Sequence, residues 1–90
     1  MLVVSYDISN TKVRTRFYKF LSKYGVRLQF SVFEIKNSVR VLNILKSEIE
    51  HTFSKQFTFA DSVLIFSTQD ETVIKYGHAI HRDKDFVVIE

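Results

Sequence analysis

The sequence predicts an α+β fold, a ferredoxin-like β-α-β-α-β-β sandwich. Three observations favour it. The 90-residue chain alternates short runs rich in Val, Ile and Phe, typical of strands, with two longer segments of helical periodicity. Both helical segments are amphipathic, so together they can cover one face of a sheet. The chain has no Pro and only two Gly, which favours a single domain over residues 1–90 without linkers.

The predicted elements follow from where each pattern begins and ends. In chain order we expect a strand at 1–7, a helix at 10–24, a strand at 26–36, a helix at 38–54, and strands at 62–68, 72–80 and 85–90. Ser9 or Asn10 can cap the first helix, and Gly25 can end it. Asn37 or Ser38 can begin the second helix.

The strand predicted at 26–36 changes phase along its length. Leu28, Phe30 and Val32 alternate, and the apolar positions then shift to Phe33 and Ile35. A β-bulge would explain such a shift within one strand.

The second face of the predicted sheet is also apolar. In the strand at 62–68, Val63 and Ile65 alternate with Leu64 and Phe66, so apolar side chains lie on both sides. Two helices cover only one face, and burying the other would contribute several kcal/mol at ~25 cal/mol per Å². We therefore expect a face-to-face homodimer, in which the last strand, at about 85–90, could pair with the second copy.

Asp7 is the candidate catalytic and metal-binding residue. It ends the first apolar run and precedes a segment dense in Lys and Arg. If Leu2, Val4 and Tyr6 face the helices, Asp7 faces the second copy, and two carboxylates approach each other across the dimer axis. A hard cation, Mg²⁺ or alternatively Mn²⁺, would relieve their repulsion. The competing interpretation is that Asp7 caps the turn that follows it.

The charge is distributed unevenly along the chain. The net charge is +3, but residues 8–46 carry nine Lys and Arg against one acid, whereas residues 47–90 carry four against eight. The candidate nucleic-acid-binding residues all lie in the basic half; they are Lys12, Arg16, Lys19 and Lys23 in a stripe at spacings of four, three and four, Arg14 on the other flank of the helix, and Arg27 beyond it. Such a surface could bind a phosphate backbone without reading bases, and the competing interpretation is a solvated helix face.

Several short motifs resemble those of the small CRISPR-associated Cas2 proteins. They are Tyr6-Asp7-Ile8-Ser9, Arg14 in the following helix, Tyr24-Gly25, Gln29-Phe30-Ser31-Val32-Phe33-Glu34, and Asp61-Ser62-Val63. Many members have a basic pair in the first helix where this chain has Val13 followed by Arg14. The resemblance spans essentially the whole chain.

This resemblance implies a ferredoxin-like homodimer that joins the Cas1 integrase during acquisition of CRISPR spacers, an antiviral defence. The dimer would bridge the integrase and support double-stranded DNA. The resemblance also implies a metal-dependent endonuclease activity on RNA or DNA, with Asp7 as the metal ligand. The adaptor role does not require that cleavage.

Other functions remain open at this stage. A toxin-like metal-dependent ribonuclease (an mRNA interferase) could use the same fold, whereas the Lys/Arg-Gly-aromatic-Gly signature of an RNA-recognition motif is absent. Core packing explains most aromatic residues, although Tyr6, Ser31 and Phe33 could shape a groove at the dimer interface. The chain has no Cys, which excludes disulfides and thiolate metal sites, and no signal-peptide pattern, so we expect a cytoplasmic protein.

Overall fold

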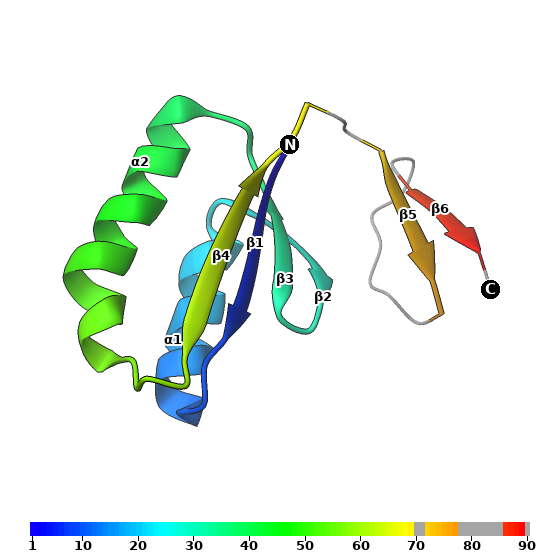
Figure 1. Cartoon of the computed structure of the whole chain (residues 1–90). Coiled ribbons are helices and arrows are strands. Elements are labelled where there is room, and N and C mark those ends of the chain that lie inside the picture. The colour runs from blue at the N-terminus through cyan, green and yellow to red at the C-terminus, as the bar shows by residue number, and fades with distance from the viewer. Residues whose placement is uncertain (70–71, 78–85, 90) are drawn as a thin grey trace.

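The computed structural model has a four-stranded sheet with two helices packed on one face (Figure 1). It describes residues 1–69, 72–77 and 86–89. The elements are β1 (Leu2–Asp7), α1 (Thr11–Ser22), β2 (Gly25–Gln29), β3 (Val32–Ile35), α2 (Val39–Glu48), a π-helical turn η1 (Ile49–Phe53), a 3₁₀ turn η2 (Ser54–Gln56), β4 (Ser62–Ser67), β5 (Val73–Tyr76) and β6 (Phe86–Ile89).

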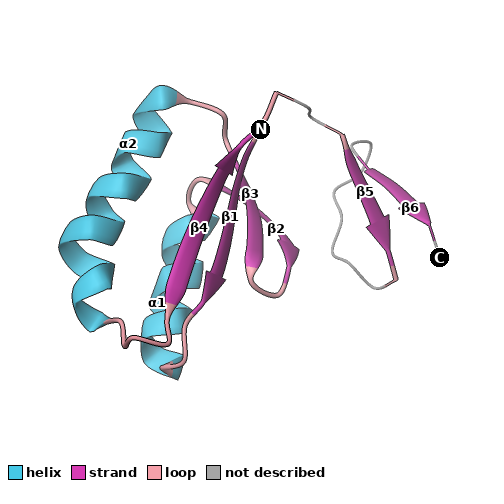
Figure 2. Cartoon of the chain, in the orientation of Figure 1, coloured by secondary structure: helices cyan, strands magenta, loops and turns pink. Residues whose placement is uncertain are grey.

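The sheet has the strand order β2-β3-β1-β4, and all its neighbours are antiparallel. With a helix after β1 and another after β3, this is the ferredoxin-like arrangement, and the predicted fold class is confirmed. β5 and β6 form a separate two-stranded parallel sheet, drawn apart from the main sheet in Figure 2. The predicted strand at 72–80 extends beyond the described residues, and pairing of the last strand with a second copy stays a prediction.

The prediction of a single strand at 26–36 is wrong, because this segment forms a hairpin of two strands. β2 and β3 are antiparallel neighbours, and the chain reverses at Phe30 and Ser31. The phase shift in the sequence therefore marks a turn between two strands. A register irregularity does occur, but it lies earlier, between Arg27 and Gln29, where the intervening Leu28 is buried.

The helices begin at two of the expected caps. The Asn10 side chain accepts a hydrogen bond from the Val13 amide at 3.0 Å, and the Ser38 hydroxyl accepts one from the Val41 amide at 3.3 Å. The first helix ends at Ser22, before Gly25.

Gly25 is instead the first residue of β2, and its lack of a side chain has a different reason from helix capping. A Cβ at this position would lie 2.0 Å from the carbonyl oxygen of Glu34 on β3. The close approach of two strands therefore requires glycine here.

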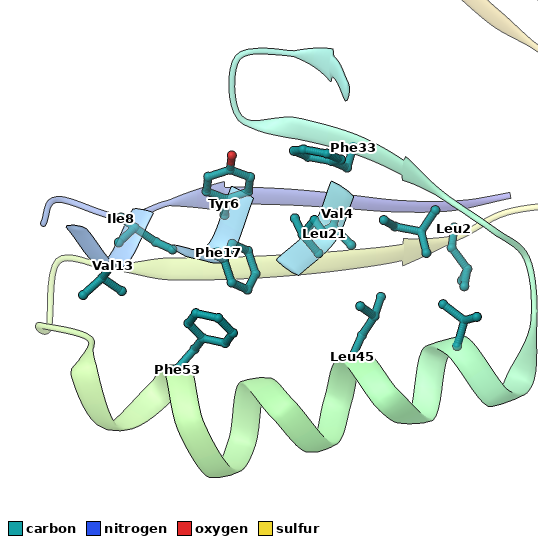
Figure 3. Close-up of a cluster of buried hydrophobic side chains, with 12 residues drawn as sticks. Leu2, Val4, Tyr6, Ile8, Val13, Phe17, Leu21, Phe33, Leu45 and Phe53 are labelled. Carbon is teal, nitrogen blue, oxygen red and sulfur yellow. The ribbon is translucent and has the colours of Figure 1, made fainter. Parts of the chain in front are cut away.

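The core lies between the sheet and the two helices (Figure 3). Val4 of β1, Phe17 of α1 and Leu45 of α2 have no exposed surface. Phe17 makes edge-to-face contacts with Tyr6 at 5.0 Å and with Phe53 at 4.9 Å between ring centroids. Such pairs contribute about 0.5–1.5 kcal/mol each beyond the area that they bury. The aromatic cluster thus fixes the end of β1 against α1 and η1.

The opposite face of the sheet is open. Leu64 and Phe66 of β4 remain 54% and 53% exposed, although β4 pairs with the central strand β1. Their cross-strand neighbours on β1 are Ser5 and Val3. The expected orientation is confirmed: alternate residues of β1 are buried beneath the helices, while Asp7 is exposed. Among the described helices, none is long and apolar enough to cross a membrane.

Candidate functional site

Asp7 is the last residue of β1, where it lies opposite Ser62 in the ladder with β4. Its side chain is exposed, and strand alternation places it on the open face with Val3 and Ser5. Within the described ranges, no three His, Cys, Asp or Glu side chains gather into a group that could hold a metal ion. The described part of one chain therefore does not complete a metal site at Asp7, and a cation bound there would need further oxygen ligands from a second copy, water or a phosphate.

The loop that follows Asp7 is held by the guanidinium of Arg14. Its Nη1 donates to the carbonyl oxygen of Ile8 at 3.0 Å and to that of Ser9 at 3.5 Å, and its Nη2 donates to the Thr11 hydroxyl at 3.4 Å. Arg14 was predicted to bind nucleic acid. In the structure its hydrogen bonds hold the segment directly after Asp7, and its binding to nucleic acid stays a prediction.

Asp61 holds the same loop from the other side, and the sequence did not indicate this role. Its Oδ1 accepts hydrogen bonds from the amide and the hydroxyl of Ser9, both at 2.9 Å, and its Oδ2 accepts one from the Thr58 amide at 2.8 Å. The backbone amide of Thr58 is the largest cause, and the Ser9 amide the next, of an Asp61 pKa below its ordinary value. An acid just before a strand commonly caps a turn, but no local pattern reveals a partner 52 positions away.

A pocket of about 150 Å³ lies between α1 and the β2–β3 hairpin. Its lining combines two guanidinium groups with aromatic rings; the residues are Tyr6, Arg14, Thr15, Tyr18, Arg27 and Phe30. The Arg27 guanidinium carbon lies 4.9 Å from the Tyr18 ring centroid and 5.7 Å from that of Phe30, within the range of cation–π attraction. Phe30 is 71% exposed, so its ring is accessible beside this cation.

Tyr6 forms the inner wall of that pocket. Burial raises the pKa of its phenol, and the nearby positive charge of Arg27 only partly opposes this shift. Its hydroxyl lies 3.5 Å from the carbonyl oxygen of Phe30. Near neutral pH Tyr6 is therefore a hydrogen-bond donor and not a phenolate nucleophile.

The predicted cationic residues separate into two surfaces. Arg14 and Arg27 meet at the pocket. The other four form the outer stripe, an exposed row on α1 and its C-terminal end; they are Lys12, Arg16, Lys19 and Lys23. Arg16 of this stripe donates a hydrogen bond to the Gln56 side chain on η2. The stripe and the pocket lie on different sides of α1, because the helical repeat of about 3.6 residues per turn points their side chains in different directions around the helix axis.

Two of the three residues expected to shape a groove at the dimer interface lie elsewhere. Tyr6 and Phe33 are buried in the core of the single chain, on the face that the helices cover. The register explains this position, since Phe33 lies opposite Val4, another core residue. Ser31 is half-buried in the hairpin turn, where its carbonyl oxygen accepts a hydrogen bond from the Tyr6 amide at 3.1 Å.

Comparison with known proteins gives consistent matches. The family model described as CRISPR associated protein Cas2 matches residues 1–75. A relative from Methanospirillum hungatei, named CRISPR-associated endoribonuclease Cas2 2, is 32% identical over 65 residues, covering 72% of this chain and 68% of the relative. Another from Chloroflexus aurantiacus, named CRISPR-associated endoribonuclease Cas2 3, is 43% identical over 47 residues, covering 52% of this chain and half of that protein.

The fold also matches a solved structure. The crystal structure of a hypothetical protein from Thermus thermophilus superimposes with a TM-score of 0.73 at 25% identity, covering 89% of this chain and 93% of the other. The residues that the family model matches include β1 through β4, and therefore every residue of the site described above.

Proposed function

Because this chain belongs to the family of CRISPR associated protein Cas2, we propose that it works in CRISPR defence as a homodimer that cleaves RNA with a divalent metal ion at Asp7. The names of the two relatives as endoribonucleases support the choice of reaction. The observation that carries the proposal is the position of Asp7, an exposed carboxylate at the edge of an apolar sheet face that the chain leaves uncovered.

The dimer follows from that open face. Leu64 and Phe66 expose about half of their surface on an ordered strand, which is costly in water unless another surface covers them. In a two-fold dimer the same patch meets itself, so residues at its edge approach their own copies. Asp7 lies on this face, and a second copy would bring a second carboxylate toward it.

The carboxylate of Asp7 suits a hard cation such as Mg²⁺ or Mn²⁺, because such ions prefer oxygen ligands and retain water. When bound, the cation would activate a water molecule and stabilise the charge that develops on a phosphodiester. The protein's own contribution is to hold Asp7 at a fixed strand end and to keep Tyr6 protonated as a donor. Arg14 and Arg27 are the groups we assign to the substrate phosphates.

A second candidate function is a structural one, supported by the outer stripe. Its four cations are exposed, and no acid lies between Ile8 and Phe33 to neutralise them. Such a one-signed surface favours the backbone of double-stranded DNA without base recognition. In this role the dimer would support DNA and join the Cas1 integrase during spacer acquisition, and Asp7 would be dispensable.

Replacing Asp7 with Asn tests the nuclease proposal, because it removes the charge and keeps the size. We expect Mg²⁺-dependent cleavage of single-stranded RNA to disappear, while the matched change Glu50→Gln, at an exposed acid on η1, leaves it intact. Cleavage that persists in Asp7→Asn and in excess chelator would refute the proposal. Spacer acquisition measured in the same Asp7→Asn variant then tests the adaptor role separately.

A further inference from the structure

The segment directly after Asp7 is held by side-chain contacts, of which those with Asp61 are long-range. The amide and hydroxyl of Ser9 both donate to Asp61, and the carbonyl oxygens of Ile8 and Ser9 both accept from Arg14. Asn10 then caps α1. The conformation of this loop is therefore held both by nearby residues of α1 and by Asp61, which is distant in the sequence.

Asp61 joins two loops at one end of the sheet. The β1–α1 loop and the α2–β4 loop lie side by side there, as Figure 1 shows and the Ser9 contacts require. The acid also closes its own turn, since its amide donates to the Thr58 carbonyl oxygen at 3.0 Å and its Oδ2 accepts from the Thr58 amide. The next residue, Ser62, is the ladder partner of Asp7. Asp61 therefore directly precedes the ladder partner of Asp7 and is hydrogen-bonded to the loop that follows β1.

We propose that Asp61 is a positioning residue, which fixes the strand end that carries Asp7 by tying Ser9 to the start of β4. This inference rests on the proposed function, in which Asp7 holds the metal ion. The physical reason is that the Asp7–Ser62 pair is the last of its ladder, and a terminal pair opens easily unless something beyond it is held. Hydrogen bonds to an ionised carboxylate are among the strongest available for that purpose.

Asp61 itself is not arranged as a metal ligand. Both of its oxygens already accept hydrogen bonds from Ser9 and Thr58. Strand alternation also separates it from Asp7, because Ser62 and not Asp61 is level with Asp7 in the ladder. Its effect on the site must therefore pass through the backbone of residues 7–9.

The test compares three variants of the full chain. Asp61→Ala removes all three side-chain acceptor contacts, and Asp61→Asn keeps one carbonyl oxygen for Ser9. Glu50→Ala is the matched control, because it also removes a carboxylate, at an exposed position on η1. For each we would measure amide hydrogen exchange at residues 7–9, Mn²⁺ affinity without nucleic acid, and kcat and KM for RNA cleavage.

We expect Asp61→Ala to raise exchange at residues 7–9 and to weaken Mn²⁺ binding by roughly 10- to 100-fold, as when the partner of a metal ligand is lost. The same variant should lower kcat with KM nearly unchanged. Asp61→Asn should recover part of each loss, and Glu50→Ala should change none of these quantities. If amide hydrogen exchange rose at Ser9 alone and Mn²⁺ affinity were unchanged, the proposal would be overturned, because Asp61 would then order only the loop and not the metal site.

If the proposed function itself is wrong, the measurements should give a different set of results. In that case Asp7→Asn would retain full cleavage and Mn²⁺ would bind no worse to it than to the wild type. Exchange at Asp7 and Ile8 in Asp61→Ala would still decide whether Asp61 orders the strand end. Unaltered exchange there would refute the positioning role whatever the reaction.

Discussion

Phe66→Thr is the most direct test of the idea that the open sheet face binds a second copy. Phe66 of β4 is 53% exposed on that face, and Thr has a β-branched side chain suited to a strand. The substitution therefore removes apolar surface from the face with little effect on the chain's own core. We expect the dimer to weaken strongly and the folded monomer to persist.

The magnitude follows from the exposed area. A fully covered Phe buries about 150–250 Å², so covering the exposed 53% of Phe66 removes roughly 80–130 Å² from water. At ~25 cal/mol per Å² this contributes about 2–3 kcal/mol, and roughly twice that when both copies of the residue are counted. Part of this gain is offset by side chains that become ordered on association, so we expect the dimer Kd to rise at least about 100-fold.

Sedimentation equilibrium at micromolar protein measures this Kd. Phe59→Thr serves as the matched control, because Phe59 is fully exposed on the loop before β4, away from the sheet face. A wild-type chain that is monomeric at these concentrations would contradict the reasoning. So would a Phe66→Thr dimer as stable as that of Phe59→Thr, since the two variants lose the same chemical groups.

Two further predictions concern charge. In the first, three residues of the outer stripe, Lys12, Arg16 and Lys19, are replaced by Glu. The triple variant should bind duplex DNA of any sequence more weakly, by a similar factor, and with a smaller salt dependence. Fluorescence anisotropy at several salt concentrations measures both effects. Equal affinity before and after would exclude this surface. Because folding lowers the pKa of Asp61, its contribution to stability is present above the carboxyl's unfolded pKa and is lost as pH falls through the folded value. Urea unfolding should therefore show a smaller acid-dependent loss for Asp61→Asn than for the wild type, and identical pH profiles would contradict this.

The fold was predictable from the sequence wherever buried residues recur at the regular spacing of a strand or a helix. The alternation of β1 gave the correct face for Asp7, because every second residue of that strand is covered by helices. The hairpin was missed because its turn, Phe30 and Ser31, lacks Gly, Pro, Asn and Asp, the residues that normally indicate a turn. Without such a signal, two short strands of apolar residues resemble one long strand.

The site was less predictable because its geometry comes from contacts between distant residues. The pairing of Phe33 with Val4 places Phe33 in the core, and this register cannot be read without knowing where the hairpin turns. The contact of Asp61 with Ser9 is similar, since it depends on two loops that meet only after the sheet has formed. The position of Asp7 as an exposed residue at a strand end was predictable, because it follows from the local alternation of one strand.

The separation of the cationic residues bears on how the two candidate roles could coexist. The pocket between α1 and the hairpin holds Arg14 and Arg27 beside the exposed ring of Phe30, a combination that suits one unpaired nucleotide. Within the part of the chain that the structure describes, no aromatic ring stacks on the cations of the outer stripe, which extends along the helix and suits the backbone of a duplex. We infer that cleavage and DNA support would use different surfaces of one dimer. Variants of Arg27 should then impair RNA cleavage and leave duplex binding intact, whereas variants of the stripe should do the reverse; a joint loss in either set would mean that both nucleic acids share a single surface.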